Sequence, residues 1–262
     1  MPPQPIAVPA SNEELLPLRA RYREEMNCQI VHDSIHCRPG WTRSYKLQLS
    51  GHCAGYGSVA IGGPWKVKSA ALEFYLLPEY RVHAFELFEA FLKAGVPLCF
   101  EAQSNDVLFT AMVLAYGRQI ASEKIVFHDK LTTSLSPNSA VFKCATPAKE
   151  IRKALEQRRG GGEWILEVNG AQAGKGGLLF HYNRPYGDIY MEINRPFRRR
   201  GLGSYLVQEL KRACYALGAL PCARCSPANV ASRKTLQRAG FVPFAHILIG
   251  RFPTRKKVGA HI

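Results

Sequence analysis

The sequence lacks any apolar run long enough to cross a bilayer, which argues against an integral membrane protein and a membrane partner. Residues 1–9 lack the charged start and long apolar stretch of a signal peptide. The eight cysteines are scattered over 262 residues, several within apolar runs, and do not form a disulfide framework. We therefore expect a cytoplasmic protein with reduced thiols.

Acidic residues are scarce in the second half of the chain. Residues 151–262 contain 20 Lys/Arg and 6 Asp/Glu, whereas residues 1–150 contain 15 and 14, so nearly all of the net charge of +15 lies in the second half. This asymmetry favours a polyanionic ligand there. It leaves open an acidic acceptor, RNA or a merely solvated basic face. No aromatic–basic RNA motif is visible, so nucleic acid is not the favoured partner.

A turn containing two glycines separates a predicted strand from a predicted helix. Residues 186–194 alternate like a strand, and residues 204–217 place their apolar residues on one helical stripe. Between them, in Arg198–Gly203, Gly201 and Gly203 allow successive backbone N–H groups to turn toward one point. The helix N-terminus adds unpaired donors and partial positive charge. The turn therefore predicts a phosphate site, with a simple tight turn as the alternative.

A second strand and helix follow this turn. Residues 221–228 are expected to form a short strand that leads into a helix beginning at Asn229. Asn229 is a favourable N-cap, and Gly240 is suited to the C′ position that closes the helix. Residues 241–249 then predict a final strand.

The two segments together resemble the GNAT superfamily of acyl-CoA N-acyltransferases. Arg198-x-x-Gly201-x-Gly203 matches the pyrophosphate loop of that family, and Asn229-x-x-Ser232 followed by Gly240-Phe241 matches its second cofactor segment. The resemblance covers roughly residues 138–252. It implies an α+β fold with a mixed, mostly antiparallel twisted sheet flanked by helices. It also implies acetyl-CoA as the acyl donor and an amine acceptor, whose identity the sequence does not give.

The first half repeats this order of elements weakly. Residues 69–81 correspond to the strand and turn, 84–95 to the helix, 96–104 to the next strand, and 105–117 to the second helix. Where Gly201 and Gly203 would fall, this half has residues 82–85, Val-His-Ala-Phe, whose side chains would crowd a pyrophosphate.

We therefore predict two tandem GNAT-like domains. Residues 1–135 would form a degenerate copy without the phosphate loop, and residues 136–262 would carry the acyl-CoA site. An unrelated α+β first domain is the alternative. The boundary is placed in residues 129–138, a polar stretch with proline, and residues 158–162 are interpreted as a loop between a helix near 147–157 and a strand starting near Glu163.

The resemblance assigns cofactor contacts to both segments. Backbone groups of residues 191–193, on a strand that splays from its neighbour, would bind the pantetheine arm. Backbone donors of the turn and several side chains would bind the phosphates. The candidates are Met191, Ile193, Arg198, Arg199, Arg200, Gly201, Leu202, Gly203, Ser204, Asn229, Ser232, Arg233 and Lys234.

The implied reaction is direct attack of the amine on the thioester in a ternary complex. Glu192 is the first candidate for the base, directly or through a water, and Asp188 is the second; pairing with an arginine is the alternative for either. Tyr190 is a candidate acid or a half-buried strand residue, and Ser232 a candidate contact to the thiol or a local backbone partner. Many members of the family place a tyrosine seven residues after the asparagine, where this chain has Leu236.

We predict no metal site, with buried thiols as the expectation. Cys28, His32, His36 and Cys37 have helical spacing that would permit a zinc site as the alternative. Cys222-x-x-Cys225 lies on a presumed strand, where odd spacing puts the two sulfurs on opposite faces.

Two further functions stay open at this point. The missing tyrosine favours a non-catalytic acyl-CoA-binding or sensing protein. The basic second half, together with known tandem versions of the fold, suggests an aminoacyl-tRNA-dependent transferase. For the oligomeric state, monomer and homodimer are both left open.

Overall fold

The computed structural model describes residues 4–30 and 33–253, which divide into two compact units. Of the described residues, 4–27, 35–122 and 247–253 belong to unit 1, and 28–30, 33–34 and 123–246 belong to unit 2. Among the described residues, no helix has both the length and the apolar character required to cross a membrane.

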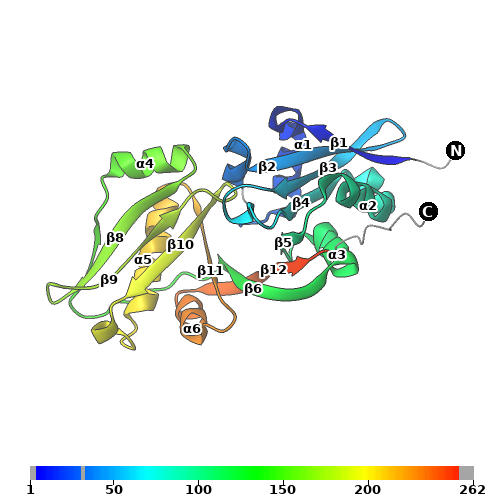
Figure 1. Cartoon of the computed structure of the whole chain (residues 1–262). Helices are drawn as coiled ribbons and strands as arrows, with labels where there is room; N and C mark the ends of the chain where they lie inside the picture. The colour runs from blue at the N-terminus through cyan, green and yellow to red at the C-terminus, as the bar shows by residue number, and fades with distance from the viewer. Residues whose placement is uncertain (1–3, 31–32, 254–262) are drawn as a thin grey trace. The chain divides into compact units, whose positions relative to one another are not determined.

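Unit 1 is a mixed sheet with three α-helices (Figure 1). Its strand order is β1-β2-β3-β4-β5-β12, where β12 is Phe241–Arg251; β4 and β5 run parallel and the other neighbours antiparallel. The elements are β1 (Pro5–Ala10), α1 (Asn12–Met26), η1 (Asp33–Cys37), β2 (Thr42–Leu49), β3 (His52–Ala60), η2 (Gly63–Trp65), β4 (Ala70–Leu76), η3 (Pro78–His83), α2 (Ala84–Gly95), β5 (Cys99–Gln103) and α3 (Val107–Tyr116).

The core of unit 1 is aromatic. The ring of Phe74 on β4 packs edge-on against Phe88 of α2, with centroids 4.8 Å apart, and Phe91 completes the contact. Burying each such ring stabilises the fold by about 1.5–3 kcal/mol. Arg19 and His36 flank the fully buried carboxylate of Glu73, and their positive charge holds the pKa of Glu73 well below its usual range despite burial.

Unit 2 repeats this arrangement. Its strand order is β6-β11-β10-β9-β8-β7, with β10 and β11 parallel and the other neighbours antiparallel. From residue 118 onward the elements in chain order are β6 (Arg118–Asp129), β7 (Ala140–Cys144), α4 (Ala148–Glu156), β8 (Gly160–Val168), β9 (Ala171–Leu179), β10 (Tyr186–Ile193), η4 (Arg195–Phe197), α5 (Leu202–Ala216), β11 (Leu220–Cys225), α6 (Val230–Arg238) and β12, whose end belongs to unit 1.

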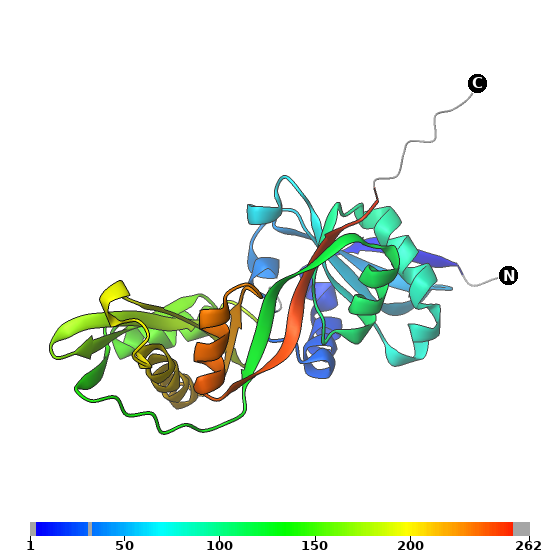
Figure 2. The ribbon, with the colours of Figure 1, turned by 90° about the horizontal axis from the view of Figure 1, so that it is seen from below.

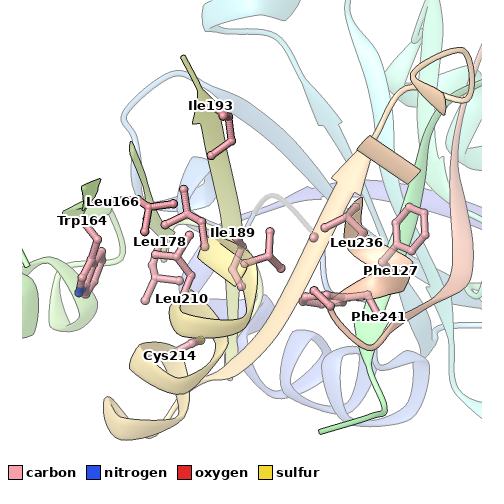
Figure 3. Close-up of a cluster of buried hydrophobic side chains, with 14 of the residues drawn as sticks. Phe127, Trp164, Leu166, Leu178, Ile189, Ile193, Leu210, Cys214, Leu236 and Phe241 are labelled. Carbon is pink, nitrogen blue, oxygen red and sulfur yellow. The ribbon is translucent and has the colours of Figure 1, made fainter. Parts of the chain in front are cut away.

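The core of unit 2 lies between its strands and α5 (Figures 1, 2 and 3). Leu178 and Ile189 extend from adjacent strands toward Leu210 of α5, and Trp164 and Leu166 continue this layer on β8. Successive strand residues point to opposite faces, so Asp188, which precedes Ile189, points away from α5. The face of the sheet away from α5 is therefore the one that carries polar side chains.

The last strand of each repeat completes the sheet of the other unit. Residues 123–129 of β6, which follow α3, pair with β11 in unit 2. Ile247–Arg251 of β12, which follow α6, pair with β5 in unit 1. The units therefore divide within β6 and β12, whereas the sequence placed the boundary at residues 135 and 136.

The α+β class and the tandem architecture are confirmed. Each repeat contains a helix, a hairpin, a third strand, a 3₁₀ turn, a helix, a strand and a helix. The helix predicted near 147–157 is α4, and Gly240 adopts a left-handed φ of 90° at the end of α6, as predicted. The loop predicted at residues 158–162 is wrong in part, because β8 already begins at Gly160, where the ladder with β9 starts.

The connection after β6 is held against α5. Gln208 of α5 donates to the carbonyl oxygen of Leu135 at 3.0 Å and accepts from its N–H at 2.7 Å. The side chains of Gln208 and Lys211 are buried, although both lie on a helix with polar neighbours. The polar stretch at residues 129–138 is thus a packed connection, because side chains of α5 satisfy its backbone groups.

Candidate functional site

The turn between η4 and α5 has an unusual backbone. Arg199 has a φ of 63° and Gly201 a φ of 75°, both in the left-handed region. This region is accessible to glycine but strained for arginine. Gly201 occupies the N-cap of α5 and has no side chain to cap it. The amides of the first helical turn are consequently left for a ligand, at the positive end of the helix dipole.

Close packing explains the second glycine of the turn. A methyl group at Gly203 would lie 3.2 Å from both Cε of Met191 and Cγ2 of Thr235. A methyl group at Gly201 would lie 3.6 Å from the guanidinium of Arg238. Gly203 therefore lets α5 approach both β10 and α6, and Gly201 leaves room beside a cation.

A cavity of about 730 Å³ opens at this turn, entirely within unit 2. It extends from the first turn of α5 to the end of β10 on one side and to α6 on the other. Its lining residues are Met191, Glu192, Ile193, Phe197, Arg198, Arg199, Gly201, Leu202, Gly203, Ser204, Asn229, Ala231, Ser232, Lys234, Thr235 and Arg238.

The lining of the cavity is strongly basic. It includes the side chains of Arg198, Arg199, Lys234 and Arg238, whereas Glu192 is its one carboxylate. Arg198 donates from Nε to the carbonyl oxygen of Ile193 at 2.8 Å, and its Nη2 lies 3.9 Å from Oε1 of Glu192. Four cations and a set of helix N-terminal amides make this cavity suited to a polyanion.

The strands β10 and β11 separate beside the cavity. Their parallel ladder runs from Tyr186–Leu220 to Ile189–Ala223 and extends no further in the described pairing. On its other side, β10 stays paired with β9 as far as Ile193. The segment Met191–Ile193 thus presents backbone groups toward the gap, next to the cavity that it lines.

The polar residues of β10 differ widely in exposure. Glu192 is 69% exposed, whereas Asp188 is 4% exposed and accepts from Nε of Arg224 at 3.1 Å. Burial raises the pKa of the Asp188 carboxyl to about 8, and burial also raises the pKa of Tyr190. A buried carboxyl with a raised pKa can take up a proton near neutral pH.

The structure brings most of the predicted cofactor residues to one cavity. Four predicted site residues, Asp188, Tyr190, Arg200 and Arg233, do not line it. The guanidinium of Arg200 lies 5.8 Å from the ring centroid of Phe197 instead.

The hydroxyl and amide side chains at the site also have local partners. Ser204 donates from its hydroxyl to the carbonyl oxygen of Thr235 at 3.1 Å and so links α5 to α6. Asn229 caps α6 by accepting from the N–H of Ser232 at 3.0 Å. Leu236, which lies further along α6, is buried in the core. These bonds fix the walls of the cavity.

Sequence reasoning missed Phe197, Ala231, Thr235 and Arg238 in the lining. The signal for Arg238 was present, since it follows Lys234 by four residues on a predicted helix and therefore shares its face. Thr235 has no comparable signal, because its role depends on the close approach of α5.

The corresponding turn of unit 1 is built differently. His83 is the N-cap of α2, with a φ of −107°, and Val82 and Phe85 expose their side chains. The N-cap of α3 is Asp106, the counterpart of Asn229, and it accepts from the N–H of Phe109 at 3.0 Å. A carboxylate there opposes anion binding.

The described residues of the alternative zinc site lie in two different units. His32 lies outside the described residues. His36 contacts Glu73 at 3.1 Å in unit 1, and Cys28 is buried in unit 2. Across residues 4–30 and 33–253, no three His, Cys, Asp or Glu side chains gather as a metal site would require.

A sequence model described as the acetyltransferase (GNAT) family matches residues 131–241. No curated protein matches the chain in sequence.

Solved structures share the fold at low sequence identity. An acetyltransferase of the GNAT family from Colwellia psychrerythraea aligns with a TM-score of 0.69 and 14% identity, covering 95% of this chain and 100% of that one. A GCN5-related N-acetyltransferase from Sphaerobacter thermophilus gives 0.58 and 14%, covering 95% of each chain. A tandem GNAT protein from the clavulanic acid biosynthesis pathway gives 0.57 and 12%, covering 94% of this chain and 97% of that one.

Proposed function

We propose, from the premise that this chain belongs to the GNAT superfamily through residues 131–241, that unit 2 is an acyltransferase. It would transfer an acetyl group from acetyl-CoA to an amine. The observation that carries the proposal is the uncapped α5 N-terminus at Gly201, which opens into a cavity lined by four cations. The family and the shared fold support acyl transfer in general.

The cavity fits the chemistry of coenzyme A. Its diphosphate would accept hydrogen bonds from the amides of residues 201–204, where the helix dipole favours negative charge. The side chains of Arg199, Lys234 and Arg238 would neutralise further phosphate charge. The pantetheine arm would extend along Met191–Ile193, where β10 has left β11.

Catalysis would follow from placing both reactants beside the end of β10. Holding thioester and amine together removes much of the entropic barrier. Glu192 lines the cavity at this point and would accept the proton of the ammonium group, directly or through a water. Asp188 is the second candidate, but it is buried and Arg224 already engages it. Tyr190 remains a candidate for protonating the departing thiolate, and Ser232 for contacting the sulfur or a water.

A non-catalytic acyl-CoA-binding protein is the second candidate function. It is favoured by the burial of Leu236 at the position of the usual tyrosine. It predicts binding of acetyl-CoA with no acylation of any amine tested. An aminoacyl-tRNA-dependent transferase predicts instead salt-sensitive tRNA binding and no affinity for acetyl-CoA.

Calorimetric titration with acetyl-CoA tests the site. The variant carrying Gly201→Glu and Gly203→Glu should abolish binding, because carboxylates would occupy the turn. Gly218→Glu is the matched control: Gly218 has a φ of 74°, close to the 75° of Gly201, and open space around it. It adds the same backbone strain as Gly201→Glu and one of the two added charges, away from the cavity. Failure of the unaltered protein to bind any CoA species would overturn the proposal.

A further inference from the structure

The point at which β10 and β11 separate is marked by an arginine. Ile189 and Ala223 are the last paired residues, so Tyr190 and Arg224 are the first residues beyond the ladder. The gap that begins here is the one that Met191–Ile193 border where they line the cavity. Under the proposed function, on which this inference rests, the reacting end of the acyl donor would lie near this point.

The guanidinium of Arg224 is fixed in orientation. Its Nε donates to Oδ2 of Asp188 at 3.1 Å, and its Nη2 donates to the hydroxyl of Tyr182. The centre of the guanidinium also lies 4.4 Å from the centroid of the Tyr182 ring. An arginine held by both a carboxylate and an aromatic ring keeps its planar donor edge in one direction.

Arg224 also remains accessible on the face that carries the candidate base. The side chain of Arg224 is 23% exposed, whereas that of its partner Asp188 is only 4% exposed, so the pair can be reached from the arginine side. Alternation along β10 places Asp188, Tyr190 and Glu192 on one face, and the ion pair puts Arg224 on the same face. A positive group at β11 and a negative group at the end of β10 therefore share the surface that an acceptor would approach.

Stability alone gives a poor reason for this arrangement. Burying Asp188 costs desolvation free energy, and its Oδ1 has no hydrogen-bond partner among the described residues. Well-packed apolar residues in place of such a pair are often as stable or more stable. A fixed guanidinium is, in contrast, the group that proteins use for planar recognition of carboxylates.

We propose that Arg224 binds a carboxylate of the substrate next to the reacting thioester, with Asp188 and Tyr182 as positioning residues. The carboxylate would belong either to an amino-acid acceptor, whose ammonium group would face Glu192, or to the far end of a dicarboxylic acyl chain. Both sources present the same group to Arg224, and substrate pairs distinguish them.

The test measures release of free CoA with matched substrates. In the acceptor arm, each of the 20 amino acids is compared with its C-terminal amide, with acetyl-CoA as donor. In the donor arm, succinyl-CoA is compared with acetyl-CoA. We expect at least a tenfold preference in kcat/KM for the carboxylate-bearing member in one arm. Arg224→Gln should remove that preference, mainly by raising KM for the carboxylate-bearing member.

Controls separate this inference from folding and from the proposed function. Arg212→Gln removes a side chain that is 58% exposed on α5 and should leave the preference intact. If Arg224→Gln fails to fold, two measurements still test the inference. One is the carboxylate preference of the unaltered protein, and the other is the preference of Arg224→Lys, which lacks the planar fork of arginine. Acetyl-CoA binding without a carboxylate preference in either arm overturns this inference alone. Absence of CoA binding overturns the proposed function.

Discussion

The ammonium group of Lys211 lies 2.6 Å from Oδ1 of Asp129, and the two side chains are only 5% and 9% exposed. Lys211 also donates to the carbonyl oxygens of Leu131 at 2.8 Å and Ala239 at 2.7 Å. One buried cation on α5 thus joins the end of β6, the connection that follows it and the end of α6. This places α6, which carries five of the sixteen lining residues of the cavity, at a fixed distance from α5.

Replacing this lysine should destabilise the fold strongly. Lys211→Met leaves the carboxylate of Asp129 and two carbonyl groups without their cation, so we expect a loss of about 3–5 kcal/mol. Urea denaturation followed by circular dichroism measures it. The neighbouring Arg212→Met breaks an exposed pair with Glu209 and should cost less than about 1 kcal/mol. Equal losses in the two variants would contradict this account.

Arg238→Gln tests the cation that the sequence did not single out. Its guanidinium lines the cavity beside Gly201, so its removal should weaken acetyl-CoA binding about 5- to 30-fold, or roughly 1–2 kcal/mol. Arg200→Gln, which removes an adjacent charge that does not line the cavity, should change the dissociation constant little. Calorimetry at fixed ionic strength compares the two. A larger effect at Arg200 would show that the cavity has been assigned to the wrong side of the turn.

Glu192→Gln separates binding from proton transfer. The exposed carboxylate is replaced by a neutral group of the same shape, so acetyl-CoA affinity should be nearly unchanged while kcat falls about 10²- to 10⁴-fold. The dependence of rate on pH should also lose its acidic limb. Glu163→Gln, on β8 two strands from β10 and outside the cavity, is the control. An unaltered pH profile would remove Glu192 as the base.

Asp106 should make stability depend on pH. Burial raises the pKa of its carboxyl to about 7, above the unfolded value near 3.8, so the folded state binds the proton more tightly. The stabilisation that this raised pKa gives to the folded state is fully present below pH 4 and is lost as pH rises to about 7. Asp106→Asn keeps an N-cap residue and abolishes this titration. The free energy of unfolding should therefore decline more between pH 5 and 8 in the unaltered protein than in the variant; parallel curves would contradict this.

Local chemistry made much of the second unit predictable. Gly201 and Gly203 lie between a strand and a helix, and Asn229 and Gly240 bound the next helix, so each signal acts within a few residues. The alternation of β10 likewise placed Asp188, Tyr190 and Glu192 on one face. These features follow from backbone preference and side-chain period, which a sequence displays directly.

The remaining features depend on contacts between distant segments. Nothing near residue 247 indicates that β12 continues into unit 1, because strand partners are chosen by the whole sheet. Whether Asp188 faces solvent or Arg224 depends on the register of β10 with β11. The sequence left open that this carboxyl pairs with an arginine, and the structure shows that pair. The turn of unit 1 has no counterparts of Gly201 and Gly203, and the aromatic core of this unit stabilises the same order of elements without them.

Each repeat contributes its last strand to the sheet of the other unit, so neither sheet is complete without both repeats. A fragment ending at residue 135 would keep β6 but leave β5 with an open edge, and a fragment starting at residue 136 would leave β11 in the same condition. Bare edges of this kind invite pairing with other chains. Removal of the repeat without the phosphate turn should therefore leave the other half prone to aggregate, whatever part that repeat has in catalysis.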